Sequence, residues 1–87
     1  MPRFFFNVYN GHGDTLDEAG TDMANQTAAH GLAVDSIRSM IAEDARRGVL
    51  DLLGRIEVVD DLDNLLVTIT FPEAFELRMP PADPAAR

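Results

Sequence analysis

The pattern that most restricts the fold is a single helical segment, residues 26–47, set between two β-rich regions. Asn25 is predicted to cap this helix, because an asparagine side chain accepts a backbone N–H of the first turn. Gly48 is expected to end it. The apolar residues recur at helical spacing and form one stripe, made of Ala33, Val34, Ile37, Met40, Ile41 and Ala45. A helix with one apolar stripe must bury that stripe against another element.

The flanking regions alternate in the way that half-buried strands do. Residues 3–10 place Phe4, Phe6 and Val8 on one face and Phe5, Asn7 and Tyr9 on the other. A short second strand is expected near residues 15–18. Residues 55–59 and 65–71 form a hairpin around the polar loop 60–64, and the last strand turns one face inward with Leu65, Val67, Ile69 and Phe71.

Burying both apolar surfaces predicts an α+β fold, a two-layer domain with one long helix packed on a small, mainly antiparallel sheet. The order of its elements is β-(β)-α-β-β. The chain has 87 residues, enough for one domain and too few for two. We therefore expect a single domain over residues 1–78, and a disordered tail rich in proline and alanine over residues 79–87.

Composition narrows the classes of function. The net charge is −8, with seven arginines and no lysine. Such a chain repels nucleic acid and anionic membranes, because binding either one requires cationic side chains. The absence of cysteine excludes disulfides, thiolate zinc sites and a thiol nucleophile. The chain lacks a signal-peptide pattern and an apolar run of about 20 residues, so a cytoplasmic protein is expected.

The first candidate site is the turn at Gly11–Gly13, where His12 is followed by Asp14, Asp17 and Glu18. A metal-dependent or acid/base enzyme would need these groups to converge. A turn flanked by glycines fixes ligands poorly, and one histidine is a weak zinc site. The spacing also differs from that of a calcium loop. A solvated hairpin tip, without metal or cofactor, is the favoured interpretation.

The other titratable residues favour structural roles. His30 falls on the apolar stripe and is expected to be partly buried, although a pairing with His12 is conceivable. Three carboxylates near the end of the helix suggest surface salt bridges, namely Glu43, Asp44 and Asp51. The loop carboxylates Asp60, Asp61 and Asp63 suit a solvated turn better than a weak cation site.

The outer face of the predicted sheet is the main functional candidate, because one helix covers only the other face. An apolar patch left on an open face is typical of a partner surface, although antiparallel sheets often keep one face in water. The candidate binding residues are Phe5, Asn7, Tyr9, Arg55, Glu57, Val59, Leu66, Thr68 and Thr70. The partner would be another protein, or a second copy in a homodimer.

Several blocks of the chain resemble a family of short, uncharacterised proteins common in alphaproteobacteria. The blocks are "PRFFFNV", "NGHGDTLDEAGT", "AAHGLAVDSIRSMIAEDARRG", "GRIEVVDD" and "LLVTITFPEAFEL". They appear in the family's order over residues 2–77. The family has no established activity, cofactor or catalytic residue, so the resemblance implies only the order of the elements.

The strand–strand–helix opening is also similar to the small antitoxins of the HicB type, whose sheet serves oligomerisation and toxin capture. This similarity is one of fold alone. Three hypotheses remain. The leading one is a non-catalytic protein-interaction module. The others are an antitoxin-like or regulatory acidic protein that neutralises a basic partner, and an enzyme that uses the tip at residues 11–13.

Overall fold

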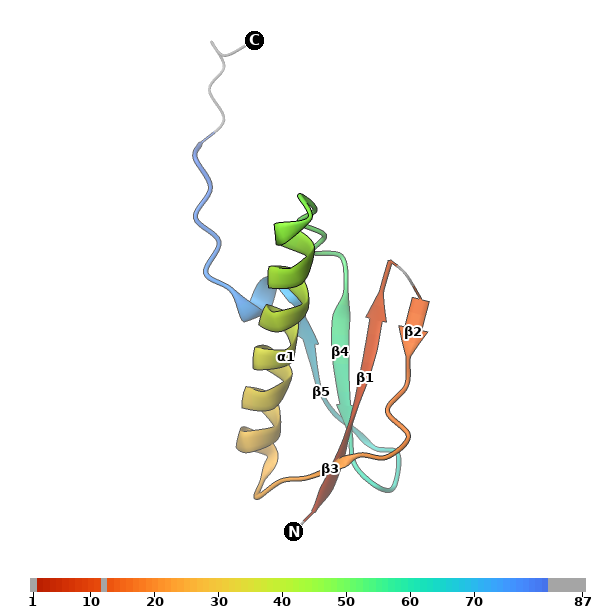
Figure 1. Cartoon of the computed structure of the whole chain (residues 1–87). Coiled ribbons are helices and arrows are strands. Elements are labelled where there is room, and N and C mark those ends of the chain that lie inside the picture. The colour runs from red at the N-terminus through yellow and green to blue at the C-terminus, as the bar shows by residue number, and fades with distance from the viewer. Residues whose placement is uncertain (1, 12, 82–87) are drawn as a thin grey trace.

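The structure is a computed structural model and describes residues 2–11 and 13–81. One helix, α1 (Gln26–Arg46), lies along one face of a sheet, so the molecule has two layers (Figure 1). The strands are β1 (Arg3–Asn10), β2 (Gly13–Thr15), β3 (Thr21–Asp22), β4 (Arg55–Val59) and β5 (Leu65–Thr70). A short 3₁₀ turn, η1 (Phe71–Ala74), follows β5. The predicted α+β class and order of elements are confirmed.

The sheet is antiparallel and has the order β2-β1-β4-β5, with β3 added to the free edge of β1. The two central strands, β1 and β4, are separated by the helix in the sequence. Their register places Phe6 opposite Val58 and Val8 opposite Ile56. These side chains face α1 and form the core with Ile69 of β5.

Local sequence signals set the limits of α1. The Asn25 side chain accepts a hydrogen bond from the Ala28 amide at 2.8 Å, which confirms the predicted cap. At the other end, Gly48 has a φ of 89°, a conformation that costs glycine little. The amides of Gly48 and Val49 return to carbonyls of the last turn at 2.9 and 3.0 Å. This pattern is the Schellman motif, so the predicted helix end is confirmed as well.

The buried stripe of α1 is narrower than the predicted one. It consists of Ala29, Ala33, Ile37 and Ile41, while Ala45 is exposed. The prediction for His30 was wrong, because this side chain is exposed. The reason is geometric: the stripe repeats every four residues, and His30 lies about 100° round the helix from Ala29.

A bulge in β5 changes the predicted face of two leucines. Val67 pairs with Val58, but Leu65, two residues earlier, pairs with the next residue of β4, Val59. Leu66 is therefore one residue too many on β5, as in a β-bulge. Leu65 was expected in the core and is instead 56% exposed. Leu66 was expected on the outer face and instead packs against the core.

The chain between β1 and α1 also differs from the prediction. In place of one strand near residues 15–18, the two short strands β2 and β3 flank an irregular segment, residues 16–20. At the other end of the chain, Met79 to Pro81 are exposed and lack regular structure. The rest of the predicted tail lies outside the described residues.

Across residues 2–11 and 13–81, no helix has both the length and the apolar character needed to cross a membrane.

Candidate functional site

The outer face of the sheet, the side opposite α1, consists of three rows of side chains across β1, β4 and β5. Directly paired residues of antiparallel strands point to the same face, so the register defines these rows. They are Phe5–Val59–Leu65, Asn7–Glu57–Thr68 and Tyr9–Arg55–Thr70. All of the predicted binding residues except Leu66 belong to these rows. Leu65 occupies the place that was predicted for Leu66.

The row that contains Tyr9 is held by an arginine. The Arg55 guanidinium carbon lies 4.5 Å from the centre of the Tyr9 ring, a cation–π contact. The Arg55 Nε also donates to a Glu57 carboxylate oxygen at 3.1 Å. Arg55 therefore directs its positive charge to two residues of the same face, Glu57 and Tyr9.

Thr70 marks the far end of the same row. Its amide and its hydroxyl both donate to Glu73 Oε1, at 2.9 and 2.7 Å. These two hydrogen bonds, with the amide bond as the larger cause, lower the pKa of the Glu73 carboxyl below its ordinary value. Glu73 thereby provides a hydrogen-bond acceptor for the backbone amide of Thr70, the last residue of β5.

Asp17 attaches the segment between β2 and β3 to the edge of β1. One of its carboxylate oxygens accepts from the Phe6 amide at 3.1 Å, at the point between β3 and β2 where the edge of β1 opposite β4 has no partner strand. The other accepts from the amides of Ala19 and Gly20, at 3.3 and 3.0 Å. The Asp17 amide in turn donates to the Asn7 side chain at 2.9 Å. A side chain thus replaces the missing stretch of edge strand.

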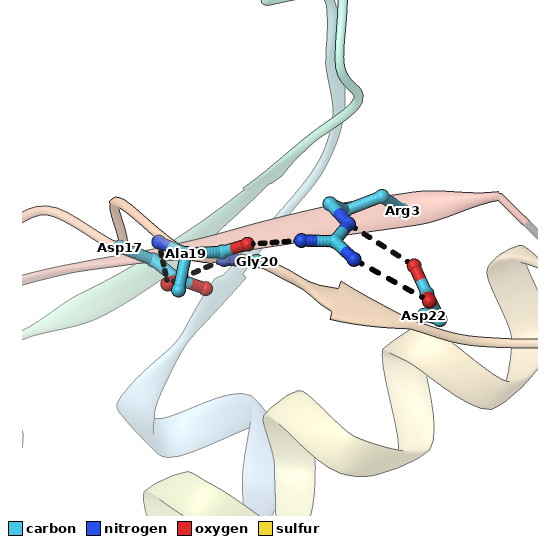
Figure 2. Close-up of polar contacts among 5 residues, drawn as sticks. All are labelled: Arg3, Asp17, Ala19, Gly20 and Asp22. Carbon is cyan, nitrogen blue, oxygen red and sulfur yellow. Dashed lines mark hydrogen bonds and ion pairs between the residues drawn. The ribbon is translucent and has the colours of Figure 1, made fainter.

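Arg3 holds the other end of this segment (Figure 2). Its guanidinium donates to the Ala19 carbonyl at 2.8 Å and to the Asp22 carboxylate at 3.1 Å. Gly20 fits beneath it with a φ of 74°. A Cβ at Gly20 would lie 2.8 Å from atoms of both Arg3 and Phe5, so the backbone can pass the sheet only at a glycine.

The loop between β4 and β5 is organised by Asp60. Its carboxylate accepts from the amides of Leu62 and Asn64, at 2.9 and 2.8 Å, and from the Asn64 side chain at 3.1 Å. The hydrogen bonds from Asn64, first from its backbone and then from its side chain, lower the pKa of Asp60. Asp60 therefore keeps its negative charge at a lower pH than an ordinary aspartate.

These two segments, residues 16–18 and the loop after β4, border an open depression of about 320 Å³ on the outer face. Figure 1 draws both segments at the same end of the sheet. Phe5, Val59, Asn7 and Leu16 line its apolar and amide part, and its acidic part consists of Asp17, Glu18, Asp60, Asp61 and Asp63. The depression combines an aromatic floor with a carboxylate rim.

Comparison with known proteins places this chain in a family. The model of a domain of unknown function, DUF6894, matches residues 3–72. The chain belongs to this family. No curated protein and no solved structure matches the chain.

Two sequence blocks of this DUF6894 domain meet in the structure. The opening block contributes Arg3 and the Phe6 amide, and the acidic block contributes Asp17, Gly20 and Asp22. Their contacts fix the edge of the sheet and one side of the depression. These residues therefore have a positioning role that their spacing along the chain does not reveal.

Among the residues that the structure describes, the remaining sequence candidates do not form a second site. His12 lies outside the described residues, and Asp14 and Glu18 are exposed. Within residues 2–11 and 13–81, no three His, Cys, Asp or Glu side chains are grouped closely enough to hold a metal ion. Near the end of α1, Arg47 pairs with Glu43 and Asp44 as expected, whereas the Asp51 carboxylate accepts from the Leu53 amide.

Sequence reasoning missed the depression because its lining comes from three separate parts of the chain. One local signal was available for Asp17, since an aspartate commonly accepts from amides two and three residues later in a turn. Nothing local indicates that residues 16–18 and the loop at 60–64 are neighbours. That proximity follows from the pairing of β1 with β4.

Proposed function

We propose that this chain is a small, non-catalytic protein-interaction module that binds a protein partner, or a second copy of itself, through the outer face of its sheet. The observation that carries the proposal is the depression on the side that α1 leaves uncovered, where Leu16 is 60% exposed although Val59 is buried. Leu65, in the same row as Phe5 and Val59, is 56% exposed. Apolar groups gathered on an open face are typical of partner surfaces.

The polar groups in the middle of the outer face hold one another in place. Arg55 is engaged by Glu57 and Tyr9, and the Asn7 side chain accepts from the Asp17 amide. These groups stabilise the face and give it a fixed shape.

A second candidate function is an antitoxin-like or regulatory role, in which this acidic chain neutralises a basic protein. The net charge of −8 and the concentration of carboxylates at the depression favour it. Charges of opposite sign steer two proteins together and raise the rate of association. The two candidates use the same face and differ in the partner.

A photo-cross-linking experiment tests the proposed face. Benzoylphenylalanine is introduced at Thr68, an exposed position in the middle row, or at Ser39, an exposed position on α1. Irradiation in native lysate is expected to give a discrete adduct from the Thr68 position alone, with a second protein or a second copy. Equal labelling from both positions, or no adduct from Thr68, would contradict the proposal.

A further inference from the structure

We propose that the depression accepts an arginine side chain with an apolar neighbour, presented by a segment of the partner protein. This inference rests on the proposed function and names the partner chemistry that the outer face fits. Three observations support it. The lining carries negative charge that no described arginine neutralises, its carboxylates divide into hydrogen-bonded and free ones, and Phe5 contributes an aromatic ring.

The charge of the depression is not balanced from within the described chain. Its lining contains five carboxylates and no arginine or histidine. The arginines of residues 2–11 and 13–81 are all engaged elsewhere, by partners on their own elements or on neighbouring ones. They are Arg3, Arg38, Arg46, Arg47, Arg55 and Arg78. No arginine of these described residues neutralises the depression, which leaves its charge open to a cation from a partner.

The carboxylates of the lining divide into two groups. Asp17 and Asp60 accept hydrogen bonds from backbone amides and so hold the two borders in place. Glu18, Asp61 and Asp63 are exposed and make no side-chain hydrogen bond or ion pair with any other residue that the structure describes. The first group builds the depression, and the second is free to contact a ligand. An arginine can donate to two carboxylates at once through its planar fork.

The floor adds a preference for a guanidinium group. The outer face has an aromatic residue at each end, and at one end Arg55 already lies over Tyr9. Phe5, at the other end, has no cation over its ring among the described residues. A guanidinium of the partner stacked on Phe5 would make the same kind of cation–π contact that Arg55 makes with Tyr9. The neighbouring apolar residue of the partner would contact Leu16, which is exposed.

The test is an NMR titration of the ¹⁵N-labelled full chain with a probe peptide, acetyl-Gly-Leu-Arg-Leu-Arg-Gly-amide. We expect saturable shifts confined to amides near Phe5, Leu16, Val59 and Asp61. A matched peptide with citrulline in place of arginine keeps the shape and loses the charge, and it should not bind. A peptide with glycine in place of leucine should bind at least tenfold more weakly.

Two variants with the same change in net charge separate a site from general attraction to an acidic protein. The site variant carries Glu18→Gln, Asp61→Asn and Asp63→Asn, and we expect it to bind the peptide at least tenfold more weakly. The control variant carries Asp35→Asn, Glu43→Gln and Glu76→Gln, all exposed and outside the lining, and should bind within twofold of the wild type.

Three results would overturn the inference: no saturable shifts in the wild type, equal weakening in both variants, or equal binding of the citrulline peptide. The wild-type titration decides the question even if a variant fails to fold. If the peptide fails while the Thr68 adduct forms, the arginine inference fails and the binding face stands. If both fail, the proposed function fails with it.

Discussion

At the edge of β1, the Asp17 side chain accepts a hydrogen bond that the backbone of a neighbouring strand would otherwise accept. Where the chain leaves the edge of β1, the Phe6 amide bonds to the Asp17 carboxylate instead of a backbone carbonyl. The same carboxylate turns the chain by accepting from Ala19 and Gly20. Hydrogen bonds to a charged acceptor are stronger than those between neutral groups, and so one residue can both close the edge and shape the segment.

Removing this carboxylate should weaken the whole domain. Asp17→Ala is expected to lower the free energy of unfolding by about 1.5–3 kcal/mol, the cost of losing charge-assisted hydrogen bonds. The neighbouring Glu18→Ala should cost less than about 0.5 kcal/mol, because it changes an exposed side chain. Urea denaturation of both variants measures the difference. Equal losses would mean that the edge of β1 does not depend on Asp17.

Asp60 should make stability depend on pH. Its folded pKa is lowered below the ordinary 3.8 by the hydrogen bonds from Asn64. A lowered carboxyl pKa means that ionised Asp60 stabilises the fold above the ordinary value, and that this stabilisation is lost as the pH falls through the lowered one. Asp60→Asn should therefore destabilise the domain at pH 7 and flatten the loss of stability below about pH 5.

The control for this pH experiment is Asp61→Asn, at an exposed position in the same loop. Its stability at pH 7 should stay within about 0.5 kcal/mol of the wild type, as for an exposed substitution, and it should keep the loss of stability in acid. Urea denaturation at a series of pH values compares the three proteins. Parallel curves for Asp60→Asn and the wild type would show that the Asn64 contacts add nothing to stability.

At the scale of the elements, the bulge in β5 determines which of two adjacent leucines supports the fold. Leu66→Ala is expected to cost roughly 1–2 kcal/mol, somewhat less than the range for a fully buried leucine. Leu65→Ala should cost less than about 0.5 kcal/mol, as an exposed substitution does. Thermal denaturation of the two variants checks the order. The reverse order would place Leu65 in the core, as strict alternation predicts.

The elements that could be predicted from sequence are those fixed by local chemistry. Asn25 and Gly48 set the limits of α1, and alternation located β1 and β4. The face of Leu66 could not be predicted, because a bulge is decided by the register with β4. The depression could not be predicted either, since it needs the pairing of β1 with β4, two strands that lie on opposite sides of the helix in the sequence.

At the scale of the whole molecule, the carboxylates of the depression should reduce stability. The chain has a net charge of −8, and exposed like charges that lie close together repel one another. The site variant with Glu18→Gln, Asp61→Asn and Asp63→Asn should therefore melt at a higher temperature than the wild type, by about 2–5 °C. A stability change of 1 kcal/mol shifts the melting temperature of a domain this small by about 4–8 °C.

Salt gives the control for this prediction. At 1 M NaCl the Debye length falls to about 3 Å, so screening should remove most of the difference between the two proteins. Calorimetry at low and high salt measures it. A variant that is less stable than the wild type at low salt would mean that these carboxylates support the fold.

The pairing of β1 with β4 also has a consequence for when the domain can fold during translation. The two central strands lie about fifty residues apart, so a ribosome releases β1 long before β4 exists. Until then β1 can pair only with β2 and β3, strands of three and two residues. Until β4 has been synthesised, the phenylalanines of β1 stay exposed to water or contact a transient partner. Most of the sheet can assemble only after the ribosome has synthesised the helix and the strands that follow it. The sheet of this domain can therefore assemble only after β4 has left the ribosome.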